Sequence, residues 1–571
     1  MGLVAVVIAF ATMIPNSQNI YGSLCFKLLW GAIVVCGCVL MYHRKLWCRP
    51  TIFFMHLSFI VILLGAFTTS ITSKRGILHL RQGIPTAYYI NQEEKEMNQL
   101  PCMVRLDTFK IVYYPGTEAP QNYISLITAE GNQYTISMNK IVRLYGYRLY
   151  QTSYDEDLQG TLLSVNYDPW GTAITYTGYL LFLLSFLISL WHPTLRKKKL
   201  AVFFSLFFVL PCKAEKLPVI PREKADSIER IQIIWNDRPC PVGTMAQDFL
   251  QKVYGRKTYH DLSATQVITS WTLSPREWNQ TPIIKQKRGE YLKMDEFIDY
   301  SSSMPKLKNI GKDAATDEKV ALILMLQQGT LIRPLPPEVT PLSEFRIEAE
   351  LWYNRIPWTV IGILACILSV VFGFIKQKKL DYVVRIITVF LLAIHFVLRW
   401  YLSGYIPLVN TYETLHFVAL CMLMIMPLGS ASTLLVAWLV ERNPQITPLM
   451  PVLHSPWLSA HVTVIMLSYV LLVISFFRRH MLYYAVSLLA IGIFLGSVWA
   501  NVSWGAYWTW DPKESWALIT LIIYSIPLHS KSLPWFQNDR NYRIYSLLAF
   551  ASLIMTYFGV NYLLGGMHSY G

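Results

Sequence analysis

Long apolar runs separated by short polar loops occupy both ends of the chain. Runs of roughly 20 residues with few charges are long enough to cross a bilayer as helices, and they predict about 12 to 13 transmembrane helices here. The predicted spans lie at about 1–14, 26–42, 51–70, 171–191, 200–212, 355–375, 381–402, 413–427, 429–441, 459–477, 482–500, 514–530 and 543–564. The chain is therefore predicted to be a polytopic α-helical membrane protein.

The stretch from Leu415 to Val440 is long enough for a single tilted helix. A single crossing, however, would put the basic loop Arg478-Arg479 on the opposite side from the other basic loops. Pro427 and Gly429 favour a break. We therefore predict a tight hairpin of two short helices.

The short loops between the spans carry much of the positive charge. They lie at His43–Lys45, Arg196–Lys199, Lys376–Lys379 and Arg478–Arg479. Because basic loops remain in the cytoplasm, these four are predicted to be cytoplasmic. The two long polar regions of the chain are then extracytoplasmic.

The two polar regions differ in pattern. Residues 71–170 alternate apolar and polar positions, as in MVRLDTFKIVYY and RLYGYRLYQTSY, with a turn signal at Tyr114-Pro115-Gly116. This alternation predicts a β-rich domain. Residues 217–353 are less regular and are predicted to form a second, mixed domain of unknown role.

A short junction, 192–216, separates the first four spans from the second domain. Its KKKLAVFFSLFFVLPCKAEK resembles a secretory signal peptide, with a basic start, an apolar core and a small residue at Ala214. In mid-chain it is interpreted as a signal-anchor-like span joining two once-separate proteins. Cleavage near Ala214 is an open alternative.

Composition narrows the function classes. The 571 residues are 53% hydrophobic with a formal charge of +15, and the basic residues fall in loops rather than in a nucleic-acid-binding pattern. The nine cysteines form no C-x-x-C pair, which excludes a thioredoxin-like motif and a zinc ribbon. A Walker A loop is also missing from the sequence, which argues against an ATP-driven pump.

Four of the twelve histidines fall into two depth pairs. His56 and His529 come from opposite ends of the chain but lie at a similar depth near the cytoplasmic face. His461 opens a span at the outer face and His568 follows the last span on the same side. Ionisable residues in spans are candidate functional residues, although a single histidine is about equally often a packing residue.

Paired imidazoles suit zinc, copper or haem iron. A structural zinc site needs four protein ligands, and no cysteine or carboxylate is placed to complete either pair. Two axial ligands suffice for haem iron, and the broad apolar porphyrin is a natural partner for flat aromatic rings.

Such rings are concentrated in WGAYWTWDPKESW, residues 504–516, here called the tryptophan loop. If the segment is helical, Trp504 and Trp508 share one face. An interfacial aromatic belt is the competing explanation, but belts scatter their rings. Asp511, followed by Pro512 and Glu514, has the pattern of a helix start, so a capping role is as plausible as a chemical one.

At these residues the sequence resembles the System II cytochrome c synthases, the fused ResB/ResC (CcsB/CcsA) proteins. WGAYWTWDPKESWALIT resembles the WWD signature of that family, and LRWYLSGYIPLVNTYETLHF, SPWLSAHVTVIMLSY and NYLLGGMHSYG resemble other CcsA segments. FFMHLSFIVILLGAFTTS, RLYGYRLYQTSYDEDL and VNYDPWGT resemble ResB. The likeness covers roughly 1–191, a ResB/CcsB-like half, and 353–571, with a CcsA-like haem-handling domain at 354–571. Residues 192–352 carry no family motif.

The resemblance implies roles for particular residues. His56 and His529 would be the transmembrane haem ligands, and His461 and His568 the external ones. The residues implied to position the haem in the WWD loop are Trp504, Trp508, Trp510 and Asp511. His395 and His416 lie in matching segments where the family has no ligand, so they are interpreted as packing residues. Arg399 is a candidate propionate contact or, equally, a snorkelling interfacial anchor.

The implied function is cytochrome c assembly in a bacterial inner membrane, with the large domains and the tryptophan loop on the periplasmic side. Ferrous haem b would be attached through thioether bonds to the C-x-x-C-H motif of apocytochrome c. The implied partners are apocytochrome c, haem, membrane lipid and a thioredoxin-like reductant, with no nucleic acid. The alternatives are a haem exporter or chaperone serving a separate ligase, and a di-haem membrane electron carrier.

Overall fold

A computed structural model of the chain describes residues 1–14, 18–91, 95–190, 218–286, 289–299, 306–308, 310–311 and 313–564. Four sequence predictions therefore lie outside the described residues. They are the basic loop Arg196–Lys199, the span at 200–212, the cleavage near Ala214 and the external histidine His568.

Among the described residues, seven helical segments are long and apolar enough to cross a membrane. They are α3 (Leu24–His43), α4 (Pro50–Thr72), α5 (Gly171–Leu190), α13 (Lys378–Ser403), α16 (Pro456–Ser475), α17 (Met481–Ser503) and Asp539–Leu564, in which α19 (Asp539–Ile554) continues as a π-helical segment (Met555–Leu564). The bent pair α11 (Glu344–Arg355) and α12 (Trp358–Phe374), inclined at 54°, makes an eighth if it crosses as one span. The prediction of a polytopic helical membrane protein is confirmed.

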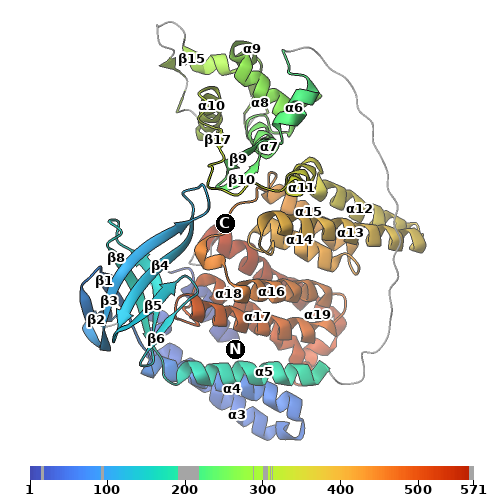
Figure 1. Cartoon of the computed structure of the whole chain (residues 1–571). Helices are drawn as coiled ribbons and strands as arrows, with labels where there is room; N and C mark the ends of the chain where they lie inside the picture. The colour runs from blue at the N-terminus through green and yellow to red at the C-terminus, as the bar shows by residue number, and fades with distance from the viewer. Residues whose placement is uncertain are drawn as a thin grey trace.

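The remaining predicted spans correspond to helices of 14 residues or fewer. They are α1 (Gly2–Ala11), α14 (Thr411–Met422), α15 (Pro427–Val440) and α18 (Pro512–Ser525), the last continued by the 3-10 turn η5 (Ile526–His529). A further short helix, α2 (Gln18–Gly22), lies between α1 and α3. The break predicted at Pro427 is present, since Pro427 is the first residue of α15, and α14 and α15 pack side by side as a hairpin (Figure 1).

An eight-stranded antiparallel sheet, formed by the residues between α4 and α5 in the sequence, lies beside the helix bundle (Figure 1). Its spatial order is β5-β4-β3-β2-β1-β8-β7-β6. The strands are β1 (Lys74–Arg81), β2 (Pro85–Asn91), β3 (Met97–Tyr113), β4 (Pro120–Ala129), β5 (Asn132–Ser137), β6 (Val142–Leu144), β7 (Tyr147–Tyr154) and β8 (Gly160–Tyr167). The alternating pattern of the sequence therefore correctly predicted a β-rich domain.

One face of this sheet forms a closed apolar core. The sheet curls, so that Ser125 of β4 donates a hydrogen bond to Gln151 of β7 at 2.7 Å. Alternate residues such as Leu78, Leu149 and Val165 are fully buried inside the curl. Their neighbours in sequence consequently point out of the curl, and those on β7 and β8 face the helix bundle.

A separate mixed domain precedes the second set of spans, at the top of Figure 1. Its helices are α6 (Arg222–Ile228), α7 (Val242–Val253), α8 (Ala264–Leu273), α9 (Pro275–Asn279) and α10 (Ala314–Gln327). Its central sheet is β9 (Gln232–Trp235), β10 (Arg238–Pro241) and β17 (Arg333–Pro334), and its two-stranded pairs are β11 (Thr258–Tyr259) with β12 (Leu262–Ser263), β13 (Ile284–Lys285) with β14 (Tyr291–Leu292), and β15 (Ile298–Asp299) with β16 (Lys306–Leu307). The fully buried rings of Trp271 and Trp278 lie in its core.

Small residues bring α4 and α5 into close contact. A Cβ atom added to Gly178 of α5 would lie 2.6 Å from Ile62, and one added to Gly65 of α4 would lie 2.6 Å from the backbone nitrogen of Thr175. Close approach over small residues is how membrane helices gain packing without a hydrophobic driving force. This packing fixes α4, and with it His56, relative to the rest of the bundle.

The Gly178→Val variant should therefore lose stability, because the added methyl groups overlap Ile62. Overpacking of this kind costs about 1–3 kcal/mol. We expect a lower apparent melting temperature of the detergent-solubilised protein. Gly31→Val on α3 is the matched control, since no atom lies within 4 Å of a Cβ at that position. Equal melting temperatures for both variants would contradict the packing described for α4 and α5.

Candidate functional site

The histidines predicted to lie at one depth near the basic loops are neighbours in the structure. His56 extends from the second turn of α4 and His529 from the turn η5 that ends α18, and their ring centres are 6.0 Å apart. A metal held between two imidazoles through bonds of about 2 Å would keep the rings about 6 Å apart. The two ends of the chain thus build one pair of candidate ligands.

Both rings are oriented by their own helices. Nδ1 of His56 donates to the carbonyl of Ile52 at 2.8 Å, and Nδ1 of His529 donates to that of Ser525 at 3.1 Å. Within the described part of the chain, neither Nε2 makes a hydrogen bond. A carbonyl acceptor at one nitrogen and an open second nitrogen is the arrangement typical of metal-binding histidines.

The external pair is described for one member only. His461 lies on the second turn of α16, where its Nδ1 donates to the Gly492 carbonyl at 2.7 Å. The close approach of α17 requires glycine, since a Cβ on Gly496 would lie 2.7 Å from the His461 ring. His568, its predicted partner, lies outside the described residues.

His395 and His416 differ from His56 and His529. They are 2% and 3% exposed, and Nε2 of each already has a hydroxyl neighbour, Tyr353 at 3.1 Å for His395 and Thr359 at 3.0 Å for His416. A metal would have to replace these contacts in a closed interior. The geometry supports their interpretation as packing residues.

The tryptophan loop is not helical over its first half. Trp504 and Trp508 therefore do not share one face of a helix, which the sequence analysis expected only if the segment were helical. Helix α17 ends at Ser503, and α18 begins only at Pro512. The Trp504 ring packs against Trp499 at 4.7 Å, whereas the Trp508 ring meets that of Trp510 edge-on at 5.6 Å. The rings thus form two groups rather than one face of a helix.

Trp510 belongs to a contact that the sequence analysis missed. Its ring stacks on that of Tyr21 at 4.5 Å and meets Phe26 at 5.2 Å, so it packs against the N-terminal helices. Its φ of +59° is in the left-handed region, which costs about 1–3 kcal/mol for a residue other than glycine. No sequence motif links residues 21 and 510; only the docking of the N-terminal helices on α18 does.

Asp511 has the capping role that the sequence offered as one alternative. Its Oδ1 accepts a hydrogen bond from the Lys513 backbone at 2.9 Å, and Pro512 is the first helical residue. Glu514 reaches back to the Thr509 backbone nitrogen at 2.8 Å. Together these two carboxylates fix where the loop ends and α18 begins.

The other end of the loop is tied to the first half of the chain. Asn501 accepts a hydrogen bond from Arg148 at 3.0 Å, and the carbonyl of Gly505 accepts one from Asn166. Tyr507 donates to Thr69, at the end of α4, at 2.9 Å. The sheet and α4 therefore position the loop, which spacing along the sequence could not reveal because the partners lie more than 300 residues away.

Arg399, the candidate propionate contact, lies in an internal network. It is 1% exposed and donates to Glu413 at 2.7 Å and to the Gln445 carbonyl at 3.0 Å. With Arg238, which donates to the Ile446 carbonyl at 2.9 Å, it holds the segment that leads to α16 and His461. The structure thus shows a positioning role for Arg399, and the propionate contact stays a prediction.

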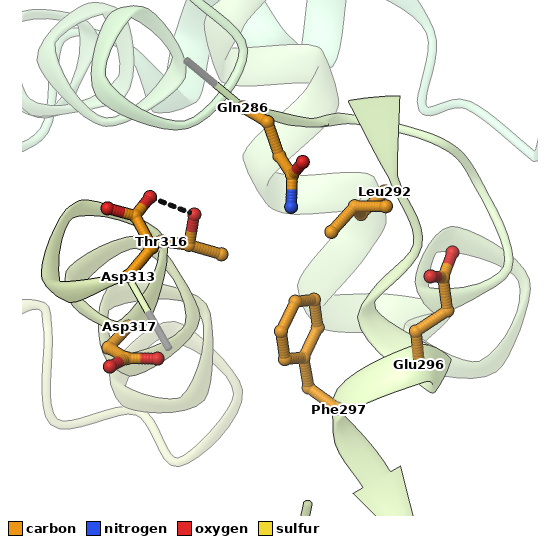
Figure 2. A pocket seen from close by; sticks show the side chains of 7 residues that line it. All are labelled: Gln286, Leu292, Glu296, Phe297, Asp313, Thr316 and Asp317. Atoms are coloured by element: carbon orange, nitrogen blue, oxygen red, sulfur yellow. Dashed lines mark hydrogen bonds between the residues drawn. The ribbon is translucent and has the colours of Figure 1, made fainter. Parts of the chain in front are cut away.

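The described residues contain no cluster of three or more histidine, cysteine, aspartate or glutamate side chains that could hold a metal ion. A pocket of about 220 Å³ lies in the mixed domain, far along the chain from any of the paired histidines (Figure 2). Its lining includes Glu296, Asp313 and Asp317 and no histidine. The paired imidazoles therefore remain the candidate metal-binding groups.

Comparison with known proteins matches both halves of the chain. Residues 39–174 match the ResB-like family and residues 477–568 match the family described as cytochrome C assembly protein. The protein NrfI of Wolinella succinogenes is 27% identical over 82% of this chain and 71% of its own length. The cytochrome c biogenesis protein CcsA is 30% identical in Mesostigma viride, over 32% of this chain and 83% of its own length, and 34% identical in Chlamydomonas reinhardtii, over 32% and 65%.

The capping role of Asp511 predicts different results for two substitutions. Asp511→Ala removes the acceptor and should destabilise the start of α18 by about 1 kcal/mol, whereas Asp511→Asn keeps the acceptor and should stay near wild type. Thermal unfolding of the solubilised protein measures both. An Asp511→Asn variant as unstable as Asp511→Ala would show that the negative charge, rather than the cap, is what matters.

Proposed function

Because the chain belongs to the ResB/CcsA family of cytochrome c biogenesis proteins, we propose that it is a synthase that attaches haem covalently to apocytochrome c. The observation that carries the proposal is the His56–His529 pair. Two distant parts of the chain bring their imidazoles to within 6.0 Å, each with Nδ1 bonded to a carbonyl. Haem iron is the metal that two such ligands satisfy.

The substrate haem would be bound twice. It enters at the basic-loop side, where His56 and His529 hold the iron, and is then held by His461 and His568 at the tryptophan loop. We propose haem b in the ferrous form as the species handled. Trp504 and Trp508 supply flat apolar contact there. The Asp511 cap and the Trp510 packing hold the loop in place.

The reaction adds the two thiols of a C-x-x-C-H motif across the two vinyl groups of haem. Each addition breaks one S–H bond and one vinyl C=C π bond; the sulfur bonds to one vinyl carbon and the proton to the other, so no oxidant is consumed. The protein's part is positioning, which can replace much of the barrier of a bimolecular step. The incoming histidine of apocytochrome c would displace one external ligand and so favour release.

The proposal implies a setting and partners. We propose a bacterial inner membrane location, with the basic loops in the cytoplasm and the tryptophan loop and both large domains in the periplasm. The thiols of the apocytochrome must be reduced before they react. Since this sequence has no C-x-x-C motif, a separate thioredoxin-like protein is the expected reductant.

Substitution of an external ligand should abolish the product. In a host without its own assembly system, co-expressed with apocytochrome c, His461→Ala and His568→Ala should each give no covalently bound haem, and added imidazole should restore it. His43→Ala, exposed at the end of α3, is the control and should match wild type. A well-expressed wild-type chain that gives no covalent product would reject the synthase, leaving an exporter or an electron carrier.

Substitution of an inner ligand should impair the first haem-binding step, before haem reaches the external histidines. His56→Ala or His529→Ala should reduce the haem that co-purifies with the protein, measured from its Soret band, because one of the two axial bonds is lost. The external variants should keep this haem, since the inner pair is intact. An unchanged Soret band in both inner variants would contradict a ligand role for this pair.

A further inference from the structure

Three arginines lie in one row across the outer face of the sheet. Residues directly opposite one another on neighbouring strands are Arg143 and Arg148, then Arg148 and Asn166, then Asn166 and Arg75. Opposite residues point to the same face, with Cβ atoms about 5 Å apart. Strands β6, β7, β8 and β1 therefore present one continuous row, here called the arginine row.

This arrangement is unfavourable by itself. Like charges directly opposite on neighbouring strands destabilise a sheet, and Arg143 faces Arg148 directly. Among the described residues, none of the three arginines makes an ion pair with a carboxylate. Elsewhere the same sheet does pair its arginines, since Arg81 contacts Asp155 at 2.7 Å. The row thus concentrates positive charge that no carboxylate of the described residues pairs with.

The centre of the row is also buried with unused donors. Arg148 is 8% exposed, and its Nη2 has no hydrogen-bond partner in the described structure. Tyr150, two residues along β7 and on the same face, is 1% exposed, and its hydroxyl is likewise unpartnered, as is Nε of Arg75. Buried donors without partners each cost about 1–3 kcal/mol. Such donors are expected where a ligand supplies the acceptor.

The phenol of Tyr150 is influenced by all three arginines of the row. Burial raises the pKa of Tyr150 to about 12, while the charges of Arg148, Arg143 and Arg75 act in the opposite direction. The charges of all three arginines therefore act on this one buried phenol. The phenol stays protonated at neutral pH and is available as a donor.

The row faces the tryptophan loop. Arg148 bonds Asn501 just before the loop, Asn166 bonds the carbonyl of Gly505, and a Cβ on Gly505 would lie 2.7 Å from the Tyr150 ring. The φ of +86° at Gly505 lets the loop backbone pass this close. Arg148 and Tyr150 consequently lie beside the start of the loop, at Gly505 next to Trp504.

We propose that the arginine row, with Arg148 and Tyr150 at its centre, binds the propionate carboxylates of haem at the tryptophan loop. The proposal rests on the proposed function, since it assigns the charged end of the porphyrin to groups from the ResB-like half. Arginine binds carboxylates through paired N–H donors, and two arginines flanking Asn166 match two carboxylates. Arg399, by contrast, already has Glu413 as its carboxylate partner.

A phosphate from a lipid headgroup offers similar chemistry. Burial favours the propionates, because Arg148 is only 8% exposed and is bonded to Asn501 beside the tryptophan loop. A lipid headgroup would reach only exposed members such as Arg143. The propionates belong to the molecule that the loop itself is proposed to hold.

The test compares haem with haem dimethyl ester, whose carboxylates are blocked. The full-length protein in detergent is titrated with each, and binding is followed from the Soret band. Wild type should prefer haem by about tenfold or more, as charge-assisted hydrogen bonds imply. Arg148→Gln and Arg75→Gln should each lower this preference several-fold through weaker haem binding, with ester binding unchanged. Arg148→Lys should retain part of it.

The control is Arg105→Gln, an arginine of the same domain that is paired with Asp107 outside the row. It should keep the wild-type preference. Melting temperatures separate binding from folding. Arg148→Gln loses the hydrogen bond to Asn501 together with a buried charge, so Arg75→Gln is the variant expected to keep the wild-type melting temperature, whereas loss of a structural arginine would lower it. A preference lost together with a lower melting temperature in both row variants would overturn the binding role.

An unchanged preference in Arg148→Gln and Arg75→Gln, with haem still bound, would overturn the arginine row and leave the proposed function intact. If these variants lose a co-purifying anionic phospholipid while their preference for haem over the ester is unchanged, the row binds lipid. That result would also overturn the proposed propionate site. A wild-type chain that binds neither porphyrin would reject the proposed function itself.

Discussion

The docking of the first 190 residues against the last 120 is the interaction on which the candidate site depends. In the membrane, Tyr179 of α5 stacks on Phe494 of α17 at 4.3 Å, and at one end of this contact His56 meets His529. At the other end Thr69 and Tyr507 share a hydrogen bond. Because lipid is as apolar as the helix surfaces, such docking relies on shape and on a few polar contacts. Neither half alone contains a complete pair of inner ligands.

The partner of Nε2 distinguishes the inner pair, His56 and His529, from the buried His395 and His416. Nδ1 of His56, His461 and His529 each donates to a backbone carbonyl, and so does that of His416. The difference lies at Nε2, which for His416 already has the hydroxyl of Thr359 as a neighbour. Nε2 of the buried His416 is thus already satisfied, whereas Nε2 of His56 and of His529 has no hydrogen-bond partner in the described part of the chain and is open to a ligand. The same reasoning applies to the arginine row.

The pattern of apolar and polar residues predicted most of the structural features that are determined within a single segment. The long spans, the hairpin at Pro427 and the β-rich domain follow from local patterns, and the common depth of His56 and His529 follows from counting along spans. What depends on pairing between segments was not predictable. The arginine row exists only through the register of four strands, and the Trp510–Tyr21 stack only through helix docking. Arg399 looked like a surface arginine in sequence, because its partner Glu413 lies on another helix.

Departures from local rules gather around the tryptophan loop. Trp510 has a left-handed backbone, Gly505 allows close contact with Tyr150, and Arg148 and Tyr150 are buried with unused donors. Each feature costs stability, and elsewhere the same sheet pairs its charge, as Arg81 does with Asp155 and Asp157. A fold selected for stability alone would replace the buried arginine with an apolar residue. Strain and unsatisfied polarity that concentrate at one place, on elements held rigidly by both halves, are what a preorganised binding site requires.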